Sequence, residues 1–202
     1  MSTNTTSVWR KKLKELEIVV VIPTYNNGKT LAAVIEEVCR YAGDIIVVND
    51  GSTDDTANIL EQYPAIRTIT HPVNKGKGTA LKHGLSQAQK EGFRYAITID
   101  SDGQHFASDI PCFIEAIEKE PDTLLVGARN LASDNMPGKN TFANKFSNFW
   151  FRLETGLKLE DTQSGYRLYP LRKMDVQSCW YTAKYEFELE AIVFAAWGDV
   201  AV

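Results

Sequence analysis

The sequence has few of the features that mark specialised protein classes. Its 202 residues include only 3 cysteines, 13 glycines and 7 prolines, too few for a disulfide framework or a collagen-like chain. No stretch provides the roughly 20 consecutive apolar residues of a membrane-spanning helix. With 22 basic and 26 acidic residues, the formal charge of -4 argues against nucleic acid as a partner. We therefore expect a single cytoplasmic domain over residues 1–202 with its own core.

Apolar runs rich in branched residues alternate with segments of helical periodicity. The runs predict strands at 18–22, 44–48, 66–70, 95–99 and 123–126. The periodic segments predict helices at 29–41, 54–62, 79–91, 109–119 and 187–197. This order predicts an α/β fold with a mostly parallel sheet and helices on both faces.

Two further segments have a distinctive composition. Residues 1–16 form a polar and basic lead to the first strand. The segment 142–153 predicts a helix with aromatic residues on one face and basic or amide residues on the other. Packing in the core is the favoured interpretation of that face, and contact with a membrane surface is the alternative.

Polar and glycine-rich residues follow three of the predicted strands, at 23–28, 49–56 and 100–105. Ligands of open α/β sheets bind at the carboxyl ends of the strands. The three segments therefore predict one ligand-binding rim.

Asp100 and Asp102 alternate in the segment after the fourth strand, and Gln104 continues the spacing. In an extended chain, alternate side chains point the same way, so these oxygens can share a hard divalent cation with a diphosphate. The alternative is a solvated turn around Gly103.

Asp50 and the segment 74–79 offer two further binding elements. The Asp50 carboxylate can accept hydrogen bonds from a nucleobase or ribose, or it can belong to an Asp-Gly turn. Residues 74–79 place Lys77 and backbone N–H groups at a helix start, where anions are favoured, although solvated lysines remain an equal alternative. The 3 histidines show no metal-ligand spacing.

Two segments near the end of the chain combine charge with small polar residues. Ser164 and Arg167 lie in a predicted loop, and the Arg guanidinium suits phosphate oxygens. Glu188 is one of three carboxylates that open the last helix, a placement that the helix dipole alone also favours.

Taken together and in order, these motifs resemble inverting family 2 glycosyltransferases of the GT-A fold, particularly the dolichol- or polyprenol-phosphate mannosyl- and glucosyltransferases. The resemblance runs from Val19 to about Trp197. The motifs that carry it are Val21-Ile22-Pro23-Thr24-Tyr25-Asn26, Val47-Val48-Asn49-Asp50-Gly51-Ser52-Thr53-Asp54, Asn74-Lys75-Gly76-Lys77-Gly78-Thr79-Ala80-Leu81, Asp100-Ser101-Asp102-Gly103-Gln104-His105, Gly127-Ala128-Arg129 and Asp161-Thr162-Gln163-Ser164-Gly165-Tyr166-Arg167.

The resemblance implies a role for each group of site residues. It places the nucleoside of a sugar nucleotide on Pro23, Tyr25, Asn27 and Asp50, and the diphosphate near Lys77. It places Mg²⁺ or Mn²⁺ on Asp100, Asp102 and Gln104. It places the sugar and the acceptor phosphate near Arg129, Ser164 and Arg167. The catalytic residues it implies are Asp102, Arg167 and, as the base for a hydroxyl acceptor, Glu188.

The expected activity is transfer of a hexose, with inversion, from a GDP- or UDP-sugar to polyprenyl phosphate. The alternatives are a family 2 transferase that acts on a saccharide hydroxyl and a nucleotide-sugar-binding domain without turnover. Peripheral contact with the inner face of a membrane and a homo-oligomer are both open. Two features depart from the family pattern: Asn27 stands where an acidic residue is common, and the chain ends early relative to the usual catalytic domain.

Overall fold

The computed structural model describes residues 3–127, 155–156, 162, 164–174, 186–198 and 200–202. Its strands are β1 (Ile18–Thr24), β2 (Ile45–Asn49), β3 (Arg67–Thr70), β4 (Tyr95–Thr98), β5 (Leu125–Val126) and β6 (Arg167–Pro170). Its helices are α1 (Thr3–Glu15), α2 (Leu31–Tyr41), α3 (Thr56–Glu61), α4 (Lys77–Lys90), α5 (Ile110–Lys119) and α7 (Glu186–Trp197), with a short 3₁₀ turn η1 (Ala107–Asp109) before α5.

The strands of the described residues form one sheet in the order β3-β2-β1-β4-β6-β5. The pairs β1–β2, β1–β4 and β2–β3 are parallel, while β6 runs antiparallel to both β4 and β5. The prediction of a mostly parallel sheet is thus confirmed. The order reverses direction between β1 and β4, and this is where an open α/β sheet leaves a crevice for ligands.

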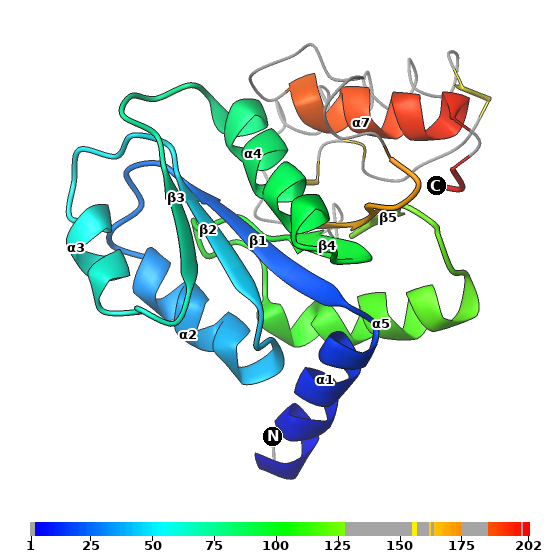
Figure 1. Ribbon diagram of the computed structural model, residues 1–202, viewed down its shortest axis with the longest axis horizontal. Coiled ribbons are helices and arrows are strands. Elements are labelled where there is room, and N and C mark those ends of the chain that lie inside the picture. Colours follow the sequence, from blue (N-terminus) through cyan, green and yellow to red (C-terminus); the bar gives the residue numbers. More distant parts are fainter. Residues whose placement is uncertain (1–2, 128–154, 157–161, 163, 175–185, 199) are drawn as a thin grey trace, which may run out of the picture.

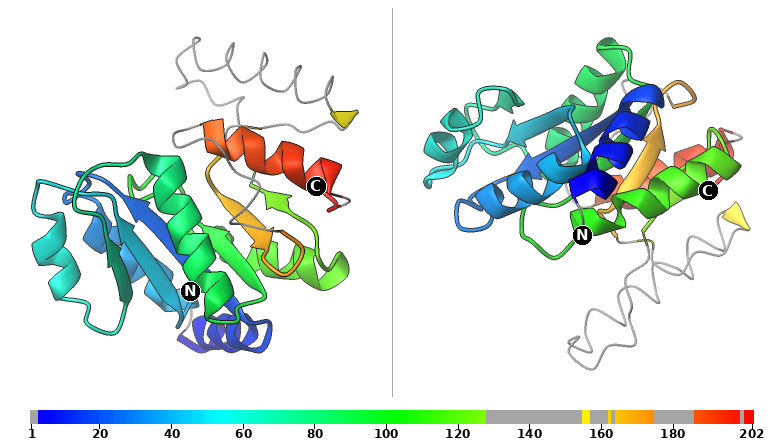
Figure 2. Two further views of the ribbon diagram at one scale, coloured as in Figure 1. Left: turned by 45° about the horizontal axis from the view of Figure 1, so that its top comes forward. Right: turned by 90° about the horizontal axis from the view of Figure 1, so that it is seen from below.

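Helices cover both faces of the sheet (Figures 1 and 2). Every residue of β1 is buried, but successive side chains enter different cores. Ile18, Val20 and Ile22 pack with residues of α1, α2 and α5, whereas Val19 and Val21 pack with residues of α4 and α7. This division explains why the strand is an unbroken apolar run, because each face of the pleat meets a helix layer.

A glycine brings α4 close to the sheet. A Cβ on Gly84 would lie 2.5 Å from Cγ1 of Val21 and 3.1 Å from Cγ2 of Val48. The helix therefore approaches β1 and β2 more closely than a larger residue would allow. This approach sets the position of the helix start, which carries the residues 76 and 77 of the predicted anion-binding segment.

Two elements were not predicted from the sequence. The polar lead contains helix α1, which buries Leu13 against the α2 and α5 layer, and β6 occupies part of the segment taken as a loop. The strand β3 was predicted from an apolar run, but it is a largely exposed edge strand. The predicted helix at 142–153 lies outside the described residues. Among the helices that are described, none is long and apolar enough to span a membrane.

Candidate active site

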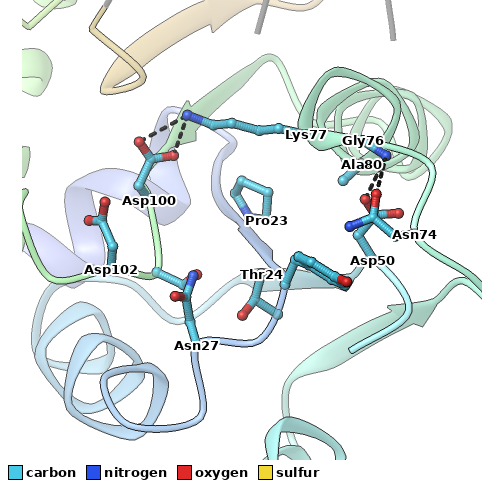
Figure 3. A pocket seen from close by; sticks show the side chains of 12 residues that line it. Pro23, Thr24, Asn27, Asp50, Asn74, Gly76, Lys77, Ala80, Asp100 and Asp102 are labelled. Atoms are coloured by element: carbon cyan, nitrogen blue, oxygen red, sulfur yellow. Dashed lines mark hydrogen bonds and ion pairs between the residues drawn. The ribbon is translucent and has the colours of Figure 1, made fainter. Parts of the chain in front are cut away.

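A pocket of about 600 Å³ lies at the carboxyl ends of β1, β2 and β4. All three polar segments predicted to meet at one rim contribute to its wall, together with the start of α4 (Figure 3). Its lining residues are Pro23, Thr24, Tyr25, Asn27, Asp50, Asn74, Gly76, Lys77, Ala80, Asp100, Ser101 and Asp102. The volume is in the range of pockets that hold small organic ligands.

The loop after β1 supplies one wall of the pocket. Tyr25 is 45% exposed, so its ring offers an apolar face to a ligand. The Asn27 side chain donates from Nδ2 to Ser101 Oγ at 2.8 Å, which ties this loop to the one after β4. Pro23 and Asn27 both line the pocket, as the predicted nucleoside contacts require.

The Asp50 carboxylate is 2% exposed and already has protein partners on both oxygens. Its Oδ1 accepts from the backbone N–H of Lys75 at 2.9 Å, and its Oδ2 accepts from that of Gly76 at 2.8 Å. His71 Nδ1 lies 2.6 Å from Oδ1. Asp50 therefore anchors the loop before α4, a function that was not inferred from the sequence, and it still contributes to the pocket wall.

Two histidines extend this anchor. His71 Nε2 lies 2.7 Å from His83 Nδ1, and His83 is on α4, so the bonded chain joins the end of β2 to the helix. Partial burial and the neighbouring His71 lower the pKa of His83. Sequence reasoning missed both residues because it looked for metal-ligand spacing, whereas these rings meet only in the tertiary fold.

Lys77 extends across the pocket from the first position of α4. Its Nζ lies 2.8 Å from Oδ1 and 2.9 Å from Oδ2 of Asp100, and 2.8 Å from Oε1 of Glu188 (Figure 3 shows the Asp100 contacts). Burial alone would lower the pKa of Lys77, but the charges of Asp100 and Glu188 outweigh it and raise that pKa above its usual value. Lys77 is therefore a charged link between two of the predicted site residues.

Asp100 and Asp102 lie next to each other on the same side of the pocket (Figure 3). Gln104 lies outside the pocket wall, and its backbone N–H donates to Asp102 Oδ1 at 2.9 Å. Among the described residues, no three His, Cys, Asp or Glu side chains gather as a metal site. Two carboxylates nevertheless fit Mg²⁺ or Mn²⁺, because such ions are often held by one or two carboxylates and the phosphates of a substrate.

Glu188 belongs to the first turn of α7 and is 5% exposed. The structure brings this residue to the side of Asp100 through their shared contact with Lys77. Glu188 does lie in the first turn of the helix, as the alternative of a charged first turn expects, and its carboxylate is in addition buried in an ion pair with Lys77.

Arg167 is not presented to the pocket. The residue is fully buried, and its guanidinium donates to the backbone carbonyl oxygens of Ser164, Thr162 and Glu188. These bonds hold the segment before β6 against the start of α7. Ser164 is also buried, and its Oγ accepts from the N–H of Tyr166 at 3.3 Å. The predicted phosphate contact of Arg129 lies outside the described residues.

The match to known proteins covers most of the chain. The model of glycosyl transferase family 2 matches residues 19–176. The UDP-N-acetylglucosamine--dolichyl-phosphate N-acetylglucosaminyltransferase of Methanococcus voltae is 32% identical over 199 residues, which cover 88% of this chain and 79% of that enzyme. The polyprenol monophosphomannose synthase of Mycolicibacterium smegmatis is 27% identical over 172 residues, with coverage of 79% and 64%.

A solved structure shares the fold. Glucosyl-3-phosphoglycerate synthase from Mycobacterium tuberculosis, in complex with Mn²⁺, UDP-glucose and phosphoglyceric acid, superposes with a TM-score of 0.72 and 21% identity. The alignment covers 94% of this chain and 68% of that one. The fold is therefore the GT-A fold that the resemblance implied. Its pocket at the strand ends and the family match over residues 19–176 place this chain in glycosyl transferase family 2.

Proposed function

We propose that this chain transfers a hexose from a nucleotide-diphospho-sugar of the GDP-mannose or UDP-glucose type to polyprenyl or dolichyl phosphate. The observation that carries the proposal is the pocket at the strand ends, where Asp100 and Asp102 lie side by side with Lys77 against them. Carboxylates and an ammonium at one place suit a ligand that brings a diphosphate together with a divalent cation. The names of two relatives support a polyprenyl or dolichyl phosphate as the acceptor. One is a dolichyl-phosphate N-acetylglucosaminyltransferase, and the other is a polyprenol monophosphomannose synthase.

Different residues of the pocket suit different parts of the donor. Tyr25 provides an exposed ring on which a nucleobase could stack, and Pro23 and Asn27 line the same pocket. The loop that Asp50 anchors leads directly into the start of α4, where N–H groups and the helix dipole favour the diphosphate. Asp100 and Asp102 would hold Mg²⁺ or Mn²⁺, which supplies positive charge to the leaving diphosphate.

The reaction is a single displacement at the anomeric carbon. An acceptor oxygen forms the new bond while the bond to the nucleoside diphosphate breaks, so the configuration inverts. A phosphate acceptor is already an anion and needs no base, so positioning and charge stabilisation supply most of the rate. With this acceptor, Glu188 acts as the partner of Lys77 and takes no proton.

A transferase that uses a saccharide hydroxyl is the second candidate, and the position of Glu188 favours it. Glu188 and Asp100 contact the same Lys77 ammonium, and Glu188 is 5% exposed. Glu188 could therefore take the proton of an acceptor hydroxyl beside the donor. A domain that binds the nucleotide sugar without turnover is the third candidate. Polyprenyl phosphate resides in membranes, so the first candidate also requires peripheral contact with a lipid surface.

Transfer of labelled sugar tests these candidates. We would incubate the protein with UDP-glucose, UDP-N-acetylglucosamine or GDP-mannose, with Mn²⁺ or Mg²⁺, and with a short polyprenyl phosphate, and measure label in the lipid fraction. One donor should give labelled lipid, and Asp102→Asn should abolish the label while Glu188→Gln leaves most of it. In a parallel incubation with a saccharide acceptor in place of the lipid, label on the saccharide that both Asp102→Asn and Glu188→Gln abolish would favour the hydroxyl acceptor. NMR of the lipid product would show whether the linkage is inverted.

Binding without turnover needs its own measurement. A ligand that binds only the folded protein raises the melting temperature, so a panel of nucleoside diphosphates and sugar nucleotides with and without Mn²⁺ would identify the donor. Metal-dependent stabilisation by one nucleotide, without hydrolysis or transfer on any acceptor, would support a binding domain. No stabilisation by any nucleotide with metal present would refute the assignment of the pocket.

A further inference from the structure

Four residues from four parts of the chain meet beside the pocket, and two of them, Lys77 and Asp100, line it. Lys77 comes from the start of α4, Asp100 from the end of β4, Glu188 from the first turn of α7 and Gly165 from the segment before β6. A Cβ on Gly165 would lie 2.7 Å from Asp100 Oδ2, 2.8 Å from Glu188 Oε1 and 2.8 Å from Lys77 Nζ. The absence of a side chain at residue 165 therefore allows the three charged groups to meet at one point.

The placement of Lys77 is costly by itself. The positive end of the α4 dipole disfavours an ammonium at the first helical position, and the Lys77 side chain is only 21% exposed. Asp100 and Glu188 compensate for both effects. Because the two carboxylates are 20% and 7% exposed, they in turn depend on the ammonium to reduce their mutual repulsion.

The charge balance of this cluster is incomplete. Asp100, Asp102 and Glu188 contribute three carboxylates and Lys77 contributes one ammonium, while His105 Nδ1 lies 3.9 Å from Asp100 Oδ2. With a neutral His105, two negative charges have no compensating cation among the described residues. A divalent cation at Asp100 and Asp102 would balance them. However, a cation bound to a carboxylate oxygen lies about 2.0 to 2.6 Å from it, and both oxygens of Asp100 are already within 2.9 Å of the ammonium.

We propose that Lys77 is an exchangeable counter-cation of the donor site. Before the donor binds, Lys77 neutralises Asp100 and Glu188; Asp100 then exchanges the ammonium for the divalent cation, and Glu188 loses its partner at the same step. This inference depends on the metal role of Asp100 in the proposed function. The exchange means that binding of the donor frees the Glu188 carboxylate from its ion pair. The freed Lys77 ammonium remains at the start of α4, where the diphosphate is expected.

Titration with Mn²⁺ alone tests the exchange, because Mn²⁺ without nucleotide separates the competition from any contact between Lys77 and phosphate. Free Mn²⁺ would be followed by electron paramagnetic resonance for the wild type and for Lys77→Met and Lys77→Gln. Removing the competing ammonium should tighten Mn²⁺ binding by at least about tenfold. The attraction between two opposite charges in contact near a protein surface is larger than the free energy that corresponds to a tenfold change in affinity. Unchanged or weaker binding in both variants would overturn the proposal.

Two controls identify the cause of a gain. Lys75→Met removes the same charge two residues earlier, where no ion pair to Asp100 is formed, and it should change the affinity by less than about threefold because an exposed charge is screened by solvent. In a Glu188→Gln background, Lys77→Met should still tighten Mn²⁺ binding. If the gain vanishes there, the metal has recruited Glu188 as a ligand and the exchange at Asp100 is refuted.

The same titration distinguishes the exchange from the proposed function. If Mn²⁺ binds neither the wild type nor the Lys77 variants, even with the nucleotides of the panel, the metal site itself is refuted. If the wild type binds Mn²⁺ and the variants gain no affinity, only the exchange is refuted. Melting temperatures provide a further check on folding: Lys77→Met should melt below the wild type without metal, and Mn²⁺ should recover most of that loss.

Discussion

Asp50→Asn is the substitution that tests most directly how the pocket is held together. The carboxylate is 2% exposed and accepts the backbone N–H groups of Lys75 on one oxygen and Gly76 on the other. Asparagine has a single oxygen, so whichever way the amide is turned, at least one of these N–H groups faces an NH₂ group. With its oxygen toward Lys75 and its NH₂ toward Gly76, the amide loses the Gly76 bond, although that N–H also donates to Asn74 Oδ1 at 3.0 Å. The substitution therefore breaks one charge-assisted bond, removes the charge from the other, and places an NH₂ group against an N–H donor.

The expected loss can be estimated from these contacts. A hydrogen bond to a charged group contributes about 1.5–3 kcal/mol, and the substitution breaks one such bond and weakens the other. Because the loop can relax partly, we expect a loss of about 3 kcal/mol in the free energy of unfolding. For a protein of this size that corresponds to a decrease of roughly 6–12 °C in melting temperature.

Urea denaturation and differential scanning calorimetry would measure this loss, with Asp55→Asn as the matched control. The Asp55 side chain is exposed and accepts the Asn58 amide at 2.7 Å, so its substitution should change stability by less than about 0.5 kcal/mol. In a transfer assay, Asp50→Asn should also raise the KM for the donor, since the loop that it anchors begins at the diphosphate site. A stability of Asp50→Asn within about 0.5 kcal/mol of the wild type would refute the anchoring role.

Three further substitutions test other parts of the structure. Gly84→Ala should lower the free energy of unfolding, measured by urea denaturation, by about 1–3 kcal/mol, because the new Cβ would lie 2.5 Å from Cγ1 of Val21. A gain of about 1 kcal/mol, as expected for this substitution in an exposed helix, would contradict the close packing. Gly165→Ala should lower the melting temperature, because its methyl group would lie within 2.8 Å of the Asp100, Glu188 and Lys77 side-chain ends and separate the ammonium from the carboxylates that compensate for its burial; an unchanged melting temperature would contradict this contact. The pKa of His83 is lowered in the folded protein, so unfolding takes up a proton near pH 6, and stability falls as the pH falls through the unfolded pKa of about 6.5. Between pH 7 and pH 5.5, the melting temperature of His83→Gln should therefore fall less than that of the wild type. An equal fall in both proteins would refute the assignment.

The fold was predictable where local sequence patterns match local structure. The apolar runs of β1, β2 and β4 were predicted because a strand covered on both faces needs an unbroken run, and both faces of β1 are indeed covered. The strand β6 was missed because its four residues include a charged residue and a proline, and the pairing of the strand with β4 involves residues about 70 positions earlier. Helix α1 was missed because its sequence is mostly polar, and among its residues whose burial is described, Leu13 alone is buried.

The candidate site divides in the same way. Asp100, Asp102 and Asn27 were predicted to face one rim because they directly follow buried strands, and the parallel order of the strands brings those ends together. The partners of these residues were not predictable. Arg167 suited a phosphate by its chemistry, but the backbone carbonyl oxygens around it take up its guanidinium in the interior.

The sequence by itself determined the α/β class, the strand-end motifs and the family, because each depends on residue types in order along the chain. Only the tertiary structure decided what each side chain does at the pocket. Asp50 anchors a loop, His71 and His83 extend that anchor, and Lys77 joins Asp100 to Glu188. The physical reason is that hydrogen bonds and ion pairs depend on separations of about 3 Å, which the folded chain creates between residues far apart in sequence.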